Sequence, residues 1–204
     1  RRMFLAAASA AALVPAQTFA LSSNEAEALV GKVVGDINKV IASGKNLNGM
    51  IGDFERIFQR YSDVSFIAGS ALGPAARGLN GSQKTRYINA FTGYISRKYG
   101  KRFNEFVGGR IEVKTTRKVK SWYEVQGTAH LQGQSPFQVN FLVSDRSGKD
   151  LFFDMVIEGI SLRLTEKSEI GAMLDQRRGN IDALITDLQK AGCYSHFQTK
   201  NPGS

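Results

Sequence analysis

The first hundred residues carry apolar side chains every three or four positions, which is the period of an amphipathic α-helix. Polar residues that favour helix starts and glycines that favour helix ends bound these stretches. The helices predicted on this basis run from 23 or 24 to about 44, from 47 to 61, from 63 to 72, and from 80 or 82 to 100. Gly73-Pro74 is predicted to interrupt the helical structure between the last two of these helices.

Beyond Gly108-Gly109 the period falls to two, as expected for strands with one covered face. Three stretches place these residues on one face: Ile111, Val113 and Thr115; Tyr123, Val125, Gly127, Ala129 and Leu131; Phe137, Val139, Phe141 and Val143. A fourth strand is predicted over 151–158. The turns between these stretches are short, and such short connections require antiparallel neighbours. The pattern therefore predicts an antiparallel meander of four strands.

The fourth strand is predicted to lead directly into a helix across Gly159. The strand residues expected to share one face are Leu151, Phe153, Met155 and Ile157, with Phe152, Asp154 and Val156 on the other. After the glycine, helical spacing places one stripe at Ile160, Leu164, Ile170 and Leu174. Ser161 is the expected N-cap of that helix. A last helix is predicted around Ile181, Leu184, Ile185 and Leu188.

Helices first, then a one-sided sheet, then helices predict an α+β fold. In this fold the helical N-terminal half packs on one face of the four-stranded meander, and C-terminal helices follow. The chain of 204 residues has no internal repeat and no linker-like composition, so residues 21–204 are predicted to form a single domain. A domain of this size buries on the order of 70% of its unfolded surface.

The first twenty residues have the order of regions found in an export signal. Arg1-Arg2 precede an apolar, alanine-rich run over 6–14, and Thr18-Phe19-Ala20 is the expected cleavage region. The paired arginines are similar to a twin-arginine signal. The apolar run is shorter than the roughly 20 residues of a transmembrane helix, which disfavours the alternative of an uncleaved anchor. We expect cleavage after Ala20 and a mature protein that is soluble outside the cytoplasm.

Residues that commonly carry catalysis or bind metals are few. His130 and His196 are the only histidines, and Cys193 is the only cysteine, so neither a metal cluster nor an intrachain disulfide is expected. The sequence has no nucleophile elbow, phosphate loop or dinucleotide fingerprint. Glu158 and Glu169 are a conceivable carboxylate pair, but solvated or capping roles are favoured for both. We therefore predict that the protein is not an enzyme and holds no metal.

The formal net charge of +9 suits an anionic partner, such as lipid headgroups, an acidic protein or nucleic acid. A merely solvated basic face accounts for the charge equally well. The basic run over 110–120 has no aromatic residue before Trp122, whereas surfaces that bind single-stranded nucleic acid usually interleave stacking residues. No nucleic-acid partner is expected.

Several segments together resemble the MlaC family, the periplasmic phospholipid-binding proteins of the toluene-tolerance, or lipid-asymmetry, ABC transport system. VIEGISL at 156–162 and TEKSEI at 165–170 resemble the family's C-terminal signature, and 71–73, 83–91, Tyr99, 111–113 and 179–185 match in the same order. The chain departs from the family pattern at Ile170, often aromatic, and Lys167, often arginine. It also lacks a tryptophan after the Leu72-Gly73 pair, and its leader differs from the commoner general-secretion leader.

The resemblance implies a carrier that shuttles phospholipid across the periplasm. Its implied partners are an outer-membrane lipoprotein complex and an inner-membrane ABC transporter with its lipid-binding domain. It implies bound phospholipid as cargo, no cofactor, and a monomer. Each buried methylene contributes about 0.8 kcal/mol, so lipid tails need an apolar cavity, expected here between helices and sheet. The charged headgroup is expected to stay in water at the mouth, near Arg or Lys.

Under this resemblance, acyl chains are expected between the apolar sheet face and the helix that ends at Gly100. Gly127 and Ala129 are small residues that would leave room on that face. The residues expected to contact acyl chains are Phe91, Tyr94, Ile95, Val125, Gly127, Ala129, Phe137, Val139, Phe141, Phe153, Met155 and Ile157. Two other functions stay open: a non-catalytic structural adaptor of an envelope complex, and a periplasmic hydrolase on a similar α+β scaffold.

Overall fold

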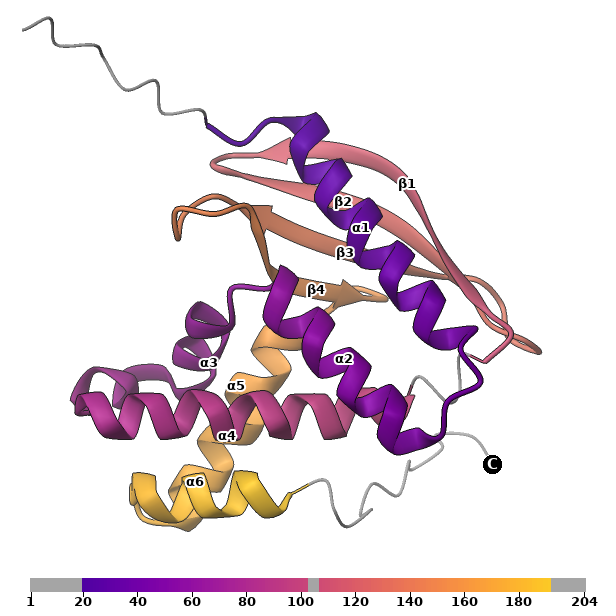
Figure 1. Cartoon of the computed structure of the whole chain (residues 1–204). Helices are drawn as coiled ribbons and strands as arrows, with labels where there is room; N and C mark the ends of the chain where they lie inside the picture. The colour runs from indigo at the N-terminus through magenta and orange to yellow at the C-terminus, as the bar shows by residue number, and fades with distance from the viewer. Residues whose placement is uncertain (1–19, 103–106, 192–204) are drawn as a thin grey trace, which may run out of the picture.

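A group of helices, an antiparallel sheet and two further helices follow one another along the chain (Figure 1). The structure is a computed structural model that describes residues 20–102 and 107–191. The helices are α1 (Ser23–Ile41), α2 (Leu47–Tyr61), α3 (Val64–Leu72), the 3₁₀ helix η1 (Gly73–Gly78), α4 (Gly81–Gly100), α5 (Leu162–Gln176) and α6 (Ile181–Lys190). The predicted α+β class is confirmed. The expected export signal, except Ala20, lies outside the described residues, as do Cys193 and His196.

The helix starts follow from local side-chain caps. Ser22 caps α1 in a reciprocal capping box with Glu25, one residue before the predicted position, and α1 ends at Ile41 instead of Gly44. Asp63 caps α3 at the predicted start, and Asn80, one of the two predicted starts, caps α4. The expected break at Gly73-Pro74 is present: α3 ends at Leu72, and the 3₁₀ helix η1 begins at Gly73.

The sheet has five strands in sequence order: β1 (Arg110–Val119), β2 (Trp122–His130), β3 (Phe137–Ser144), β4 (Leu151–Ile157) and β5 (Ile160–Ser161). The four predicted strands are present, and the two-residue β5 is an addition to the prediction. It pairs with β4 through a hairpin at Glu158 and Gly159, whose φ values of 50° and 78° match the type I′ turn that two-residue hairpins favour. Ser161 then caps α5, as predicted.

Register in β4 differs from the predicted alternation because of a β-bulge. Val143 lies opposite Phe152, whereas Phe141 lies opposite Met155, so one extra residue is inserted in β4. Directly opposed residues share a face of the sheet. Phe152 therefore lies on the face of Met155, and the prediction that Phe153 shares that face is wrong.

Ring contacts agree with this register. Phe152 packs against Phe58 and Phe141, while Phe153 packs edge-on against Phe66 and Trp122. A bulge changes which residues face the core without changing the apolar composition of the strand. A simple alternation with a period of two in the sequence does not reveal that inserted residue.

A second bulge lies in β1, between Val113 and Thr115. Beyond it, Thr116 lies opposite Val125 and Thr115 lies opposite Gln126. The predicted placement of Thr115 on the apolar face is therefore wrong, and Thr116 takes that place.

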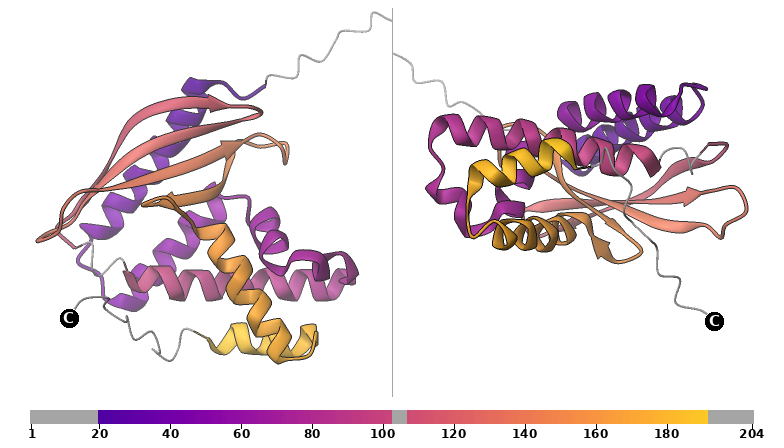
Figure 2. Two further views of the ribbon diagram at one scale, coloured as in Figure 1. Left: turned by 180° about the vertical axis from the view of Figure 1, so that it is seen from behind. Right: turned by 90° about the horizontal axis from the view of Figure 1, so that it is seen from below.

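Helix α1 lies across the face of β1, β2 and β3, and the other helices form a group beside it (Figures 1 and 2). Asn38 of α1 fixes this contact. Its side-chain amide donates to the Ile111 carbonyl oxygen at 3.1 Å and accepts from the Ile111 amide at 3.0 Å. In the helical group α4 contacts both α2 and α6, while α5 contacts α3 and β4. The core lies between the sheet and these helices.

The face of α5 that is buried also differs from the predicted one. Ile160 and Leu164 are 63% and 52% exposed, whereas Glu166 and Ile170 are buried. Positions four apart lie on one helix face, so α5 buries the face that carries Glu166 and Ile170. The predicted apolar stripe through Ile160 and Leu164 is therefore wrong.

Gly127 of β2 lies where the flanking strands approach closely, and this predicts a stability effect. A Cβ at this position would lie 2.9 Å from the Glu112 carbonyl oxygen and 3.2 Å from that of Val139. Both are backbone atoms of paired strands and cannot turn aside. We expect Gly127→Ala to lower the free energy of unfolding by about 1–3 kcal/mol, measured by urea denaturation.

The matched control is Gly171→Ala in the interior of α5, where an added Cβ meets no atom within 4 Å. Alanine is favoured over glycine in a helix, so this variant should be as stable as the parent protein or more stable. Equal stability of the Gly127 and Gly171 variants would contradict the role assigned to the close approach.

Candidate functional site

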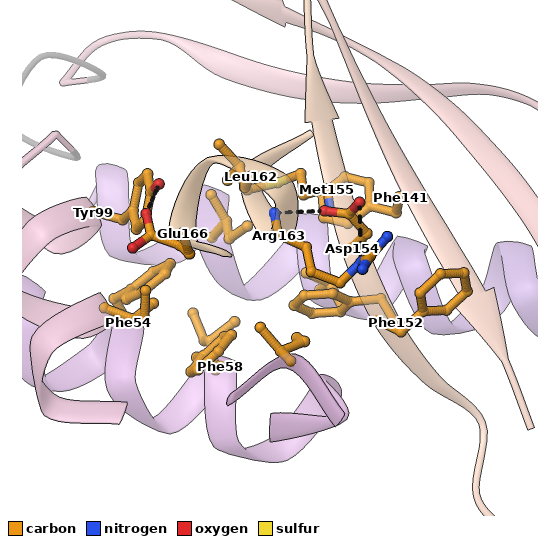
Figure 3. A pocket seen from close by; sticks show the side chains of 16 residues that line it. Phe54, Phe58, Tyr99, Phe141, Phe152, Asp154, Met155, Leu162, Arg163 and Glu166 are labelled. Atoms are coloured by element: carbon orange, nitrogen blue, oxygen red, sulfur yellow. Dashed lines mark hydrogen bonds and ion pairs between the residues drawn. The ribbon is translucent and has the colours of Figure 1, made fainter. Parts of the chain in front are cut away.

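A mostly apolar cavity lies between the sheet and the helices (Figure 3). Its lining residues are Val33, Ile37, Phe54, Ile57, Phe58, Ile67, Ile95, Tyr99, Phe141, Phe152, Phe153, Asp154, Met155, Leu162, Arg163 and Glu166. The space inside it that the centre of a water molecule can occupy is about 60 Å³. That is smaller than the roughly 300–1,000 Å³ of pockets that bury a small-molecule ligand. A long-chain ligand must therefore move the walls apart.

Aromatic rings from α2, β3 and β4 form much of the wall. Phe54 and Phe58 lie one helical turn apart on α2, and their rings stack with centroids 6.1 Å apart. Phe152 contacts the rings of Phe58 and Phe141, at 6.5 and 5.8 Å. Each such ring pair contributes about 0.5–1.5 kcal/mol beyond the apolar area that it buries.

At one end of the cavity, the buried side chain of Asp154 in β4 lies beside the first residues of α5. Asp154 accepts hydrogen bonds from Ser161 Oγ at 2.6 Å and from the Arg163 backbone amide at 3.0 Å. The Arg163 side chain donates to Ser70 Oγ at 2.8 Å, and its Nε lies 3.7 Å from the carboxylate of Asp154. A carboxylate at a helix N-terminus is stabilised by the helix dipole. The charges at this end compensate one another.

The opposite end carries Glu166, whose side chain is only 2% exposed (Figure 3). Its Oε1 accepts from Lys98 Nζ at 2.7 Å and from Tyr99 Oη at 2.5 Å. The same ammonium donates to Glu169 at 2.5 Å, and Tyr94 Oη donates to Glu169 at 3.0 Å. Lys98 thus joins two carboxylates of α5 to the end of α4.

Burial raises the pKa of Glu166, and the charge and hydrogen bond of Lys98 oppose that rise. Burial also raises the pKa of Tyr99 and of Tyr94, and the nearby charge of Glu166 raises both further. The two phenols are therefore neutral O–H donors at physiological pH.

The raised pKa of Glu166 predicts how stability depends on pH. Folded protein holds the proton of Glu166 to higher pH than unfolded protein, whose glutamates titrate near 4.5. The contribution of Glu166 to the free energy of unfolding is therefore fully present below about pH 4.5. It is lost as pH rises through the pKa of Glu166 in the folded protein. We expect the unfolding free energy of the parent protein, relative to Glu166→Gln, to fall as pH rises from 4.5. Urea titrations across that range measure it, and a difference that grows with pH would contradict the expectation.

Four of the twelve residues expected to contact acyl chains border the cavity: Ile95, Phe141, Phe153 and Met155. The other eight lie outside the lining: Phe91, Tyr94, Val125, Gly127, Ala129, Phe137, Val139 and Ile157. Gly127 and Ala129 lie in β2 opposite Val113 and Ile111 of β1, on the side of the sheet near α1. A glycine is needed at position 127 because the flanking strands approach it closely.

Sequence reasoning missed the cluster around Glu166. A signal was available, because Glu166 and Glu169 are three residues apart and so lie on one face of a helix. The pair considered instead, Glu158 and Glu169, shares no partner among the described residues. Glu158 accepts from the Gln138 backbone amide at 2.7 Å beside the β4–β5 turn, whereas Glu169 accepts from Lys98 at 2.5 Å.

His130 is the one histidine within the described ranges 20–102 and 107–191. His130 Nε2 lies 3.5 Å from the carboxylate of Glu112 on the polar side of the sheet. Within those ranges no group of His, Cys, Asp or Glu could hold a metal ion. Nor does any helix there have the length and apolar character needed to cross a bilayer.

Fold and cavity together define an α+β protein with an apolar chamber between a one-sided antiparallel sheet and its helices. The chain belongs to the MlaC family: the family model described as MlaC protein matches residues 27–190. The resemblance seen in the sequence is thereby confirmed.

A solved structure shares the fold. It is a phospholipid-binding protein from Ralstonia solanacearum in complex with a phospholipid, 19% identical in sequence, with a TM-score of 0.70. The match covers 82% of this chain and 97% of that chain. A search of curated protein sequences found no match.

Proposed function

We propose that this protein is a periplasmic phospholipid-binding carrier and not an enzyme. The observation that carries the proposal is the apolar cavity enclosed by α1–α5 and the β3–β4 edge of the sheet. Membership of the MlaC family and the phospholipid in the related Ralstonia structure support the same ligand class. Under this proposal the cargo is phospholipid, and no cofactor is needed.

Acyl chains would enter by displacing the aromatic wall. A phospholipid has on the order of thirty tail methylenes, each contributing about 0.8 kcal/mol when buried, which is ample to offset movement of a few side chains. Ile95, Phe141, Phe153 and Met155 would make the first acyl contacts because they already border the cavity. The remaining eight predicted residues would be reached only as the chamber widens toward β2 and α4.

Membership of the MlaC family supports a transport role. The carrier would receive and deliver phospholipid between an outer-membrane lipoprotein complex and an inner-membrane ABC transporter with its lipid-binding domain. It would act as a monomer in the periplasm after removal of residues 1–20. Without Arg1 and Arg2 the chain keeps a formal net charge of +7, which favours contact with anionic headgroups.

The test is to purify the mature protein without detergent, extract it under denaturing conditions and identify bound lipid by mass spectrometry. Diacyl phospholipid in a near-stoichiometric amount supports the carrier. Protein that is lipid-free and also takes up no phospholipid from vesicles would overturn it. The structural adaptor would then be favoured, with exposed Ile160 and Leu164 as its contact residues. Hydrolysis products in place of intact lipid would instead favour the hydrolase.

A further inference from the structure

One carboxylate oxygen in the cavity wall has no hydrogen-bond partner. Among the described residues, the buried side-chain atoms without a partner are His130 Nε2, Asn140 Oδ1, Arg163 Nε and Glu166 Oε2. Glu166 is the only residue of these four that is almost completely buried, at 2% exposure. A buried acceptor without a donor costs about 1–3 kcal/mol, and more when it is charged. Such an atom calls for a specific explanation.

Three neighbouring donors lie close to the Glu166 carboxylate, but none of them bonds to Oε2. Lys98 Nζ and Tyr99 Oη both donate to the other oxygen, Oε1, and Tyr94 Oη donates to Glu169. Figure 3 shows the two oxygens of Glu166 diverging, one toward Tyr99 and the other away from it. Because Glu166 lines the cavity, the missing donor can come from a molecule that enters the cavity.

We propose that Glu166 Oε2 forms a subsite for a hydroxyl group on an acyl chain, so that this cavity selects hydroxylated chains over plain ones. The inference rests on the proposed function, because it assumes that acyl chains enter the cavity. A plain acyl chain has no donor and would leave Oε2 unpaired against methylenes.

A hydroxyl fits this position better than an ammonium. Lys98 Nζ lies 2.7 Å from Oε1 of the same carboxylate and already places a positive charge beside it. An ammonium would also lose its hydration on entering a wall that is otherwise apolar, whereas a neutral hydroxyl loses far less. The apolar rings of Phe54 and Phe58 can pack against the chain on either side of the hydroxyl.

The experiment compares octadecanoate with octadecanoates hydroxylated near the carboxyl, at mid-chain and near the methyl end. Their affinities are measured by displacement of a fluorescent fatty acid from delipidated protein. We expect one hydroxyl position to bind about tenfold more tightly than the plain chain, as a hydrogen bond to a charged acceptor allows. Its methyl ether, which cannot donate, should lose that gain.

Two variants locate the effect. Glu166→Met removes the acceptor and keeps a side chain of similar length, so plain and hydroxylated octadecanoate should bind this variant equally well. Glu169→Gln alters the other carboxylate held by Lys98, outside the lining, and should retain the preference. Thermal unfolding confirms that each variant is folded. If Glu166→Met fails to fold, the comparison of hydroxyl with methyl ether in the parent protein decides.

Plain and hydroxylated chains that bind equally, or a preference that survives in folded Glu166→Met, would overturn the subsite. The proposed carrier function would stand in that case, because the chains still bind. Absence of binding by every chain, together with no phospholipid uptake, would overturn both.

Discussion

Replacing Lys98 with methionine is expected to lower the free energy of unfolding by about 3–5 kcal/mol at neutral pH. Lys98 is 15% exposed and holds the buried carboxylate of Glu166 as well as that of Glu169. Without the ammonium, only the hydrogen bond from Tyr99 still opposes the effect of burial, so the pKa of Glu166 rises further. The loss should shrink in acid, where Glu166 is protonated. Urea denaturation at neutral and acidic pH measures both effects.

The double variant Lys98→Met with Glu166→Met serves as the internal control. Replacing both members of a buried ion pair with apolar residues is often close to neutral, so most of the stability should return. Lys39→Met provides a surface comparison, because Lys39 pairs with Asp36 while 80% exposed, and it should change stability little. Losses that simply add in the double variant would contradict a coupled buried pair.

The second large effect is expected from Ile95→Trp, which fills the cavity from α4. Ile95 is 4% exposed and borders a chamber with only about 60 Å³ of free space. The larger tryptophan side chain should lower the free energy of unfolding by about 1–3 kcal/mol through overpacking. It should also leave little room for acyl chains, so bound phospholipid should fall about tenfold or more, measured by extraction and mass spectrometry.

Ile88→Trp is the matched control on the same helix. Ile88 is half-buried and lies outside the cavity lining, so the same added volume should leave phospholipid loading unchanged. Full loading of Ile95→Trp would show that lipid binds elsewhere, and the cavity would lose its assigned role even if the protein remains a lipid binder.

Local sequence signals predicted the elements well because the forces that set them are local. α2 begins and ends at the predicted residues, and Asp63, Asn80 and Ser161 cap their helices through bonds to backbone three residues on. The strands of the meander also followed from alternation and short turns. These features depend on contacts within a few residues of the chain.

Two kinds of feature could not be read from the sequence. The bulge that turns Phe153 away from Met155 depends on how β4 pairs with β3, which periodicity does not encode. The cavity joins α2 and α5 to the sheet edge, so Phe54 and Glu166 become neighbours only in the folded chain. Patterns identify apolar faces, but they do not say where packing is incomplete.

The bond between Asn38 and Ile111 has a consequence for how the sheet meets other chains. β1 is an edge strand, and unpaired backbone groups on such strands invite a strand of another molecule to join the sheet, which begins aggregation. The Asn38 amide occupies both the N–H and the carbonyl of Ile111. Further along β1, charged Lys114, Arg117 and Lys118 disfavour the close approach of a second strand. The β1 edge is thus protected against self-association by one side-chain amide and a row of charges.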